Sequence, residues 1–274
     1  MLEYASGTGG ASVGLDAGSM HVGTAAELRS RTWGYALGHR GAYGAVRSAR
    51  EVSVRLKSSD GAALDRARRV FDRDVQAGTC GELVYAGEWR TRALVVAACP
   101  TSIYRCNVSL DLTVVLIDGV WRRRHELYVP LPSNSAGGGG IDIPYDCPYD
   151  LASPLPPSFV RACEWGESSV GLRIYGPATD PAVTIAGNTY QVLRDVGSSE
   201  RVEVDGVSRS VELVTAAGGC INIAADAVRG TGRGCGRYIF EPLPPGESRI
   251  EADGSFAFDV IWHDEEGEPP WAPC

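Results

Sequence analysis

The sequence contains very little lysine. Lys57 is the only lysine among the 26 Lys and Arg side chains of a 274-residue chain. These cations are outnumbered by 34 Asp and Glu, which gives a formal net charge of −8. Nucleic-acid-binding proteins gain most of their affinity when Lys and Arg neutralise phosphates. We therefore expect no specific nucleic-acid binding.

Long apolar runs are also missing. Residues 1–30 contain Gly, Ser, Thr and acidic side chains where a signal peptide needs an apolar run of about 7–15 residues. No stretch approaches the roughly 20 apolar residues of a membrane-spanning helix. We expect a protein that is made in a cytoplasm, stays soluble and has no membrane span.

The eight cysteines do not follow a metal-binding or redox spacing, because no C-x-x-C pair occurs. A chain of this length can bury a core without disulfides, so free thiols are expected inside the cell, and disulfides could form once particles leave it. The cysteines are Cys80, Cys99, Cys106, Cys147, Cys163, Cys220, Cys235 and Cys274.

Signals for catalysis are equally sparse. Gly10–Gly14 matches G-x-S-x-G, but it lacks the preceding strand and following helix of a nucleophile elbow. The alternating glycines of Gly230–Gly236 lead into an apparent strand at Tyr238–Phe240, whereas a phosphate loop leads into a helix. No histidine lies two or four residues from another; the four are His21, His39, His125 and His263. We predict no catalytic residue, no cofactor and no enzyme activity.

A metal site is not predicted either. Asp142, Asp146 and Asp150 are spaced by four, as oxygen ligands of calcium could be. However, no EF-hand spacing is present, and the intervening prolines fix an extended path that separates the carboxylates.

What is abundant is glycine, with 34 residues, and proline, with 16. Many turn residues in a folded protein indicate many short strands. One helix is predicted, beginning after Ser59 or Asp60 as N-cap and ending at Gly78. Its apolar stripe is Leu64, Ala67, Phe71 and Val75.

Alternating or apolar runs predict the strands of the first half, at 33–37, 50–56, 82–85, 88–98 and 108–117. Asp118-Gly119 is typical of a hairpin turn, from which the chain would return beside the strand 108–117. The basic run Arg122, Arg123 and Arg124 on that return is best explained by a solvated strand or an acidic neighbour, so we predict it as a partner interface.

The second half contains no helical periodicity and predicts strands at 169–175, 182–185, 189–193, 201–204, 207–214, 238–240 and 255–262. The segment Asp264–Pro270 is acidic and is not expected to pack a core. Trp165, Trp262 and Trp271 are candidate sugar-stacking platforms, although aromatic residues are also ordinary core and interface residues of β proteins.

Between the halves lies a segment rich in Pro and Gly. Its tyrosines, Tyr145 and Tyr149, predict that its middle docks against a partner. The predicted division is a domain at 1–130, a linker or docking segment at 131–158 and a second domain at 159–274.

Three strings are more specific than composition. They are YGPATDPAVTIAGNTY at Tyr175–Tyr190, YIFEPLPPGES at Tyr238–Ser248 and EEGEPPW at Glu265–Trp271. With a first half of strand, helix and paired strands, they make the chain resemble the siphophage distal tail protein family over nearly its whole length. The resemblance implies a mostly β fold: an N-terminal β-sandwich or barrel-like belt domain with one α-helix, and a C-terminal galectin-like β-sandwich.

The resemblance also implies a function. Such a protein forms a hexameric ring at the distal end of the phage tail, joins the tail tube protein to the tail-tip hub or tail-associated protein, and lets DNA pass. Tape measure and receptor-binding proteins are further implied neighbours, and the localisation is the virion. An acidic lumen would keep the exiting DNA mobile. The alternatives are a carbohydrate-binding adhesion module of the tail tip and another minor tail protein.

Overall fold

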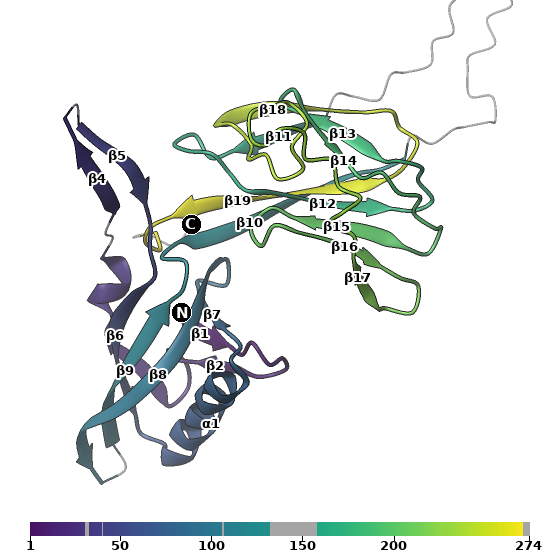
Figure 1. Cartoon of the computed structure of the whole chain (residues 1–274). Helices are drawn as coiled ribbons and strands as arrows, with labels where there is room; N and C mark the ends of the chain where they lie inside the picture. Colours follow the sequence, from purple (N-terminus) through teal and green to yellow (C-terminus); the bar gives the residue numbers. More distant parts are fainter. Residues whose placement is uncertain (31–32, 40, 106, 132–157, 271–274) are drawn as a thin grey trace, which may run out of the picture. The chain divides into compact units, whose positions relative to one another are not determined.

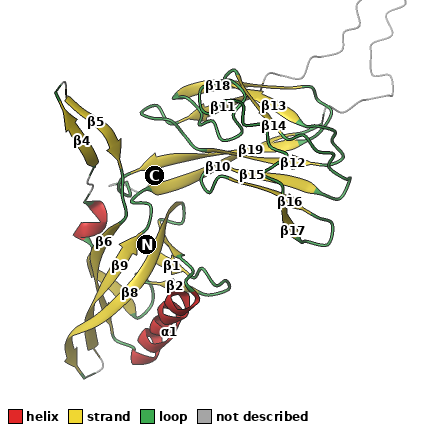
Figure 2. Ribbon diagram, in the orientation of Figure 1, coloured by secondary structure: helices red, strands yellow, loops and turns green. Residues whose placement is uncertain are grey.

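The computed structural model describes residues 1–30, 33–39, 41–105, 107–131 and 158–270. These residues form antiparallel sheets and a single α-helix, which confirms the predicted mostly β fold (Figure 2). No helix within these ranges is long and apolar enough to cross a membrane.

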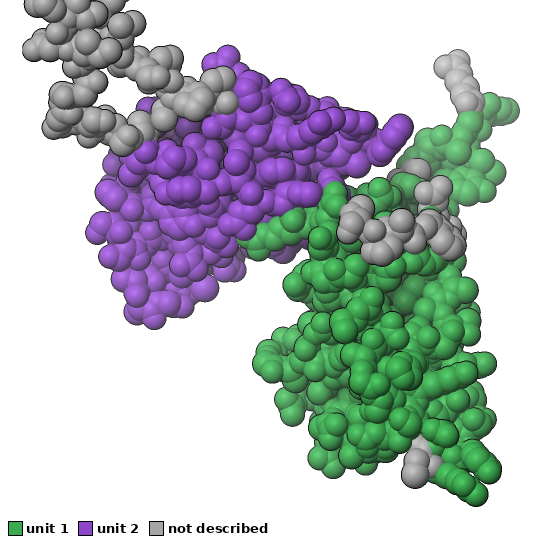
Figure 3. Space-filling model, turned by 180° about the vertical axis from the view of Figure 1, so that it is seen from behind, with its two compact units in different colours: residues 1–124, 265–274 green, residues 125–264 purple. Residues whose placement is uncertain are grey.

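The chain divides into two compact units (Figure 3). We call residues 1–124 with 265–274 the N-terminal unit and residues 125–264 the C-terminal unit. Residues 132–157 lie outside the described residues, and with them Tyr145 and Tyr149. The predicted boundaries at 130 and 158 therefore stay a prediction.

The N-terminal unit is built on one antiparallel sheet in the order β2-β1-β7-β8-β9-β6-β3 (Figure 1). Strand β10 pairs with Trp89 and Arg90 at the start of β8, whereas β9 pairs with β8 from Ala93 onward. The strands are β1 (Leu2–Ala5), β2 (Ser12–Gly14), β3 (Met20–Thr24), β6 (Arg50–Ser58), β7 (Gly81–Tyr85), β8 (Trp89–Tyr104), β9 (Asn107–Leu116) and β10 (Trp121–Val129). A short 3-10 helix, η1 (Ala26–Arg29), follows β3.

Alternation along the central strands decides which face of this sheet is buried. Val52, Val54 and Leu56 of β6 are buried, whereas the residues between them face solvent. The even-numbered residues of β9 from Leu110 to Leu116 repeat the pattern. Helix α1 (Gly61–Ala77) contacts β6 and β8 and shares one core with them. The opposite face of these strands remains polar.

Both ends of α1 lie where the sequence predicts them. The Asp60 side chain accepts a hydrogen bond from the Ala62 backbone N–H at 2.8 Å, and Gly78 adopts a left-handed conformation with φ of 64°. The predicted apolar stripe is wrong at one position: Val75 is 44% exposed, and Asp74 is buried instead.

Asp74 connects α1 to the start of the chain. Its carboxylate accepts hydrogen bonds from Tyr4 Oη at 2.8 Å, Ser6 Oγ at 2.7 Å and Thr8 Oγ1 at 3.1 Å. The backbone N–H groups of Gly7 and Thr8 donate to it as well. Burial alone would raise the pKa of Asp74, but these hydrogen bonds outweigh it and hold that pKa below its ordinary value.

The hairpin predicted at Asp118-Gly119 is wrong. Strand β10 pairs with β8 and β19, not with β9, which lies between β6 and β8. The two residues form a turn, but Asp118 accepts hydrogen bonds from Arg92 and Arg122 of the two strands β8 and β10. Arg92 lies 26 residues before Asp118 and Arg122 four residues after it, so Asp118 connects β8 to β10.

The C-terminal unit is a sandwich of two sheets, ordered β17-β16-β15-β12-β19-β10 and β11-β18-β13-β14. Its further strands are β11 (Ser158–Ala162), β12 (Val170–Tyr175), β13 (Ala182–Ile185), β14 (Asn188–Gln191), β15 (Arg201–Asp205), β16 (Ser210–Val214), β17 (Cys220–Asn222), β18 (Gly246–Ala252) and β19 (Phe258–Glu266). Buried side chains from both sheets form one core, for example Leu172 and Val260 opposite Val183 and Ile250.

One strand predicted in this half is absent. Tyr238–Phe240 is a turn and not a strand, although the Ile239 side chain is fully buried. The acidic segment 264–270 supplies no side chain to the two hydrophobic cores, although β19 continues to Glu266 and Pro269 is buried.

Arg29 holds this returning segment within the N-terminal unit. Its Nη1 donates to the carbonyl oxygens of Pro269 and Pro270, both at 2.9 Å, and its Nη2 donates to Tyr85 Oη at 3.0 Å. Its guanidinium also lies over the Tyr85 ring. A charged donor to two backbone carbonyls thus holds the end of the acidic segment in place.

Asp74→Asn should lower the free energy of unfolding by about 2–4 kcal/mol, because an amide cannot accept all the hydrogen bonds made to the carboxylate. The folded-state pKa of Asp74 is depressed, so its stabilisation is present at neutral pH and is lost as pH falls below about 4 through that pKa. Urea unfolding between pH 3 and 7 should therefore show a smaller acid-induced loss in the variant. Asp72→Asn, exposed on the same helix, is the matched control and should behave as wild type.

Arg29→Ala should free the segment 267–270 while leaving the core folded. We expect a Glu-specific protease to cut after Glu266 about tenfold faster, since two hydrogen bonds to a charged donor are lost. Arg66→Ala on the exposed face of α1 serves as control. Equal cleavage of wild type and Arg29→Ala would contradict the role given to Arg29.

Candidate interaction surfaces

An isolated β-ribbon is the most exposed element of the N-terminal unit. Strands β4 (Gly34–Gly38) and β5 (Gly41–Val46) form a two-stranded sheet of their own, which we call the arm (Figure 1). Among the described residues, neither strand pairs with a third. A lone hairpin is marginally stable in water, so the arm gains little from its own hydrogen bonds.

Apolar side chains cover both faces of the arm. Tyr35, Leu37 and Tyr43 are 60%, 75% and 62% exposed. Tyr35 and Leu37 share one face by their spacing of two, and Tyr43 lies opposite Ala36 and so belongs to the other. At the base, the Arg47 guanidinium lies 4.6 Å from the centre of the Trp33 ring. Exposed apolar surface concentrated in this way is typical of a protein–protein contact.

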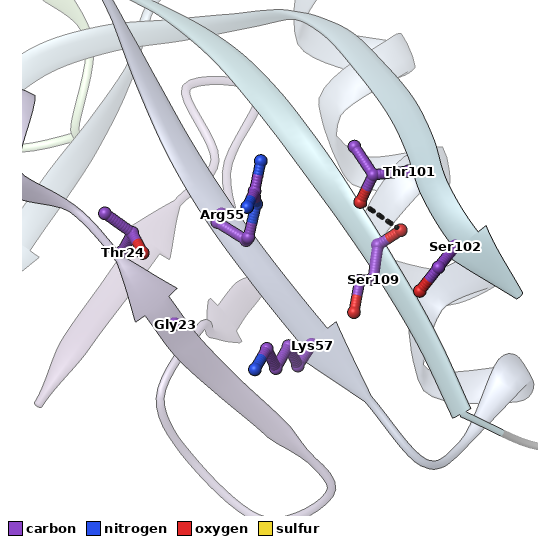
Figure 4. Close-up of a pocket in the computed structure, with 7 residues that line it drawn as sticks. All are labelled: Gly23, Thr24, Arg55, Lys57, Thr101, Ser102 and Ser109. Carbon is purple, nitrogen blue, oxygen red and sulfur yellow. Dashed lines mark hydrogen bonds between the residues drawn. The ribbon is translucent and has the colours of Figure 1, made fainter.

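A polar groove lies on the solvent face of the main sheet, opposite α1 (Figure 4). It has a volume of about 410 Å³. Arg55 and Lys57 of β6 form its floor, and the remaining lining residues are Gly23 and Thr24 of β3, Thr101 and Ser102 of β8, and Ser109 of β9. The Asp111 carboxylate accepts two hydrogen bonds from Arg55, at 2.7 and 2.9 Å. Sequence reasoning missed this groove.

Two arginines of the predicted interface run have partners within the N-terminal unit. Arg122 donates to Asp118 at 2.7 Å and to Glu265 at 3.1 Å, and it is mostly buried. Arg123 lies over the Trp89 ring. The third, Arg124, is exposed. A role of this run in binding a partner stays a prediction, and Arg122 is mainly engaged inside the protein.

The pKa shifts of Asp118 and Arg122 agree with the engagement of Arg122 inside the protein. Burial would raise the pKa of Asp118, but hydrogen bonds from Arg92 and Arg122 hold it below its ordinary value. Burial would also lower the pKa of Arg122, yet the carboxylates of Asp118 and Glu265 raise it. Each charge is thus compensated by a near neighbour.

The three candidate tryptophans differ in their surroundings. Trp165 is 89% exposed in the turn after β11. The Trp262 ring stacks on His125 with centroids 5.3 Å apart, and its indole N–H donates to the Arg161 carbonyl at 3.0 Å. Trp271 lies outside the described residues. Of the two candidates that the structure describes, Trp165 is the more exposed, and one face of the Trp262 ring is occupied by His125.

A charged cluster on the outer face of the C-terminal unit was not predicted. Arg173 of β12 contacts Glu126, Glu203 and Asp259 at 3.2–3.3 Å, and Tyr175 Oη donates to Asp259 at 2.6 Å. Burial and the hydrogen bond to Asp259 raise the pKa of Tyr175. The cluster joins four adjacent strands by placing three carboxylates around one guanidinium, so it is suited to fixing strand order.

The sequence motifs weighed for catalysis have no catalytic surroundings. Ser12 of the G-x-S-x-G match lies on β2, at the edge of the sheet, and no helix follows it. Gly230–Gly236 is a series of turns. Across the described ranges, no group of three or more His, Cys, Asp and Glu is arranged to hold a metal ion. The trio Asp142, Asp146 and Asp150 lies outside those ranges.

Comparisons with known proteins address the fold. No protein-family model and no curated protein matches the sequence. Among solved structures, the chain is similar to the Dit (gp 19.1) protein of phage SPP1, a paradigm of the hub adsorption apparatus in phages that infect Gram-positive bacteria. The TM-score is 0.57 and the identity 10%, over 97% of this chain and 99% of that one.

It is also similar to a chain of the phage P2 baseplate in its activated conformation with Ca. The TM-score is 0.58 and the identity 9%, over 98% of this chain and 100% of that one. The same baseplate with Sr gives the same values. At such low identity the likeness concerns the fold, and it extends over both units: the chain has the fold of these phage hub and baseplate proteins from end to end.

Proposed function

We propose that this protein is a structural distal tail protein of a phage with a long flexible tail. In this role it forms a hexameric ring that joins the tail tube to the tail-tip hub and leaves a passage for DNA. It acts by assembly and not by catalysis. The full-length likeness to phage hub and baseplate proteins supports the class of protein. The arm is the observation within this chain that carries the proposal.

The arm supports a ring because its exposed apolar surface can be one of the two different patches through which identical subunits bind one another. A closed ring of identical subunits uses heterologous contacts, in which one patch binds a second patch on the next copy. The arm supplies an apolar patch. Strand β3 pairs only with β6 among the described strands, so its other edge is open to receive an added strand.

Charge supports a passage through which DNA slides. The C-terminal unit carries 19 Asp and Glu against nine Arg, whereas the N-terminal unit is close to neutral. A lumen that is not basic does not retain a polyanion. A basic lumen in the potential of the assembled ring would contradict this part of the proposal.

Light scattering of the purified chain, alone and mixed with the tail tube protein, tests the ring. We expect a hexamer in at least one condition. A triple variant Tyr35→Ser, Leu37→Asp and Tyr43→Ser should be monomeric in both, because it removes the apolar contacts of the arm. Its urea midpoint should match wild type, since all three side chains are already exposed.

Trp165→Ser removes an even more exposed aromatic residue outside the arm and should leave the mass unchanged. A wild-type chain that is monomeric in both conditions, or an arm variant that still forms the hexamer, would overturn the assignment.

The open ring face of Trp165 favours a second candidate, a carbohydrate-binding adhesion module. Glycan-array binding by wild type that is lost in Trp165→Ala would favour it, and binding retained in that variant would exclude this residue. In Trp262 the ring is already stacked on His125, so Trp262→Ala should mainly lower stability.

A further inference from the structure

The polar groove of the N-terminal unit is built where two strands break their regular pairing. Opposite β6, the register of β3 shifts between Val22 and Thr24, so Gly23 is an extra residue. Opposite β9, the register of β8 shifts between Pro100 and Ser102, so Thr101 is a second extra residue. Both of them line the groove. β-Bulges redirect side chains and are frequent beside functional sites, and here two of them border one groove.

Two cations lie side by side next to the bulge at Gly23. A Cβ at this position would be 3.4 Å from Lys57 Cε and 3.6 Å from Arg55 Cγ. These are ordinary van der Waals separations, so both aliphatic stems run close to β3 at the bulge. Arg55 and Lys57 are two residues apart on β6 and so point to the same face (Figure 4).

The bulge at Thr101 contributes hydroxyl groups to the other wall. Thr101 Oγ1 donates to the Ser109 carbonyl at 3.2 Å, which fixes that side chain in the groove. Ser102 and Ser109 are a cross-strand pair with neighbouring side chains. The donor capacity of Thr101 is used in this bond, and the hydroxyl groups left to donate beside the two cations are those of Thr24, Ser102 and Ser109, from three strands.

The charge of the groove is not balanced internally. No carboxylate is among its lining residues, and Asp111 compensates Arg55 only. Among the described residues, no carboxylate lies within 4 Å of the Lys57 ammonium. An ammonium group is a compact point charge with three donors, a property suited to phosphate.

We propose that this groove binds a phosphate-type oxyanion. Lys57 supplies the unpaired charge, Arg55 a partly compensated one, and the hydroxyl groups supply further donors. The net charge of −8 opposes a long polyanion, so the ligand is an isolated phosphate group and not a nucleic-acid backbone. The inference is independent of the proposed role in the tail.

Titration of the full chain with inorganic phosphate, by calorimetry against chloride at equal ionic strength, tests the site. Lys57→Gln should weaken phosphate binding by about tenfold to a hundredfold, the range for a hydrogen bond to a charged group. Gly23→Ala should leave it unchanged, because the new methyl group would lie at ordinary van der Waals distance from both stems. Arg69→Gln, an equal change of charge on the exposed face of α1, should have no effect.

A second titration with a 12-base-pair duplex separates the two sources of phosphate. Phosphate binding that depends on Lys57, with no tighter binding of the duplex, supports the proposal. Duplex binding that is tighter than phosphate and depends on Lys57 would overturn the assignment to an isolated phosphate group. No phosphate binding above chloride, or an equal loss in Lys57→Gln and Arg69→Gln, would overturn the site itself.

Discussion

A face of a β-sheet is buried only where another layer covers it, and this constraint decides which surfaces of each unit are buried and which face solvent. In the C-terminal unit, two sheets cover each other and leave charged outer faces such as the Arg173 cluster. In the N-terminal unit, α1 covers one face of the main sheet, so the other is polar and holds the groove. The arm is covered on neither face, yet it carries apolar side chains. Its composition is therefore explained by a partner and not by the folded monomer.

Local signals in the sequence predicted the elements whose physics is local. The cap at Asp60, the left-handed Gly78 and the stripe of α1 need only neighbouring residues to be recognised. The strands at 50–56 and 108–117 follow from alternation, which reports one-sided burial directly. Val75 was misassigned because an apolar residue fits the spacing of the stripe. The buried residue is Asp74, which is stabilised by five hydrogen-bond donors at the start of the chain.

The remaining features depend on pairing between distant segments, which a single sequence does not encode locally. Asp118-Gly119 has the composition of a hairpin turn, but β10 pairs with β8 and β19 and does not return beside β9. The acidic segment after Asp264 is ordered by Arg29, more than 200 residues earlier. The groove depends on two bulges, and a bulge is a property of register between strands. None of these three features is marked by a motif in the sequence.

The distribution of exposed groups is consistent with a protein that works by assembly. The charged groups around Asp118 and Arg173 have their ion-pair partners inside the protein, so they stabilise the fold without requiring a ligand. Two surfaces differ from this pattern: the arm exposes apolar area, and the groove exposes an unpaired ammonium group. The exposed apolar area of the arm lowers the solubility of an isolated monomer and is relieved by a partner, whereas the exposed Lys57 ammonium is solvated and available to an anion. The arm is suited to an apolar protein partner, and the groove is polar and cationic. The two surfaces therefore serve different partners, and loss of one should leave binding at the other intact.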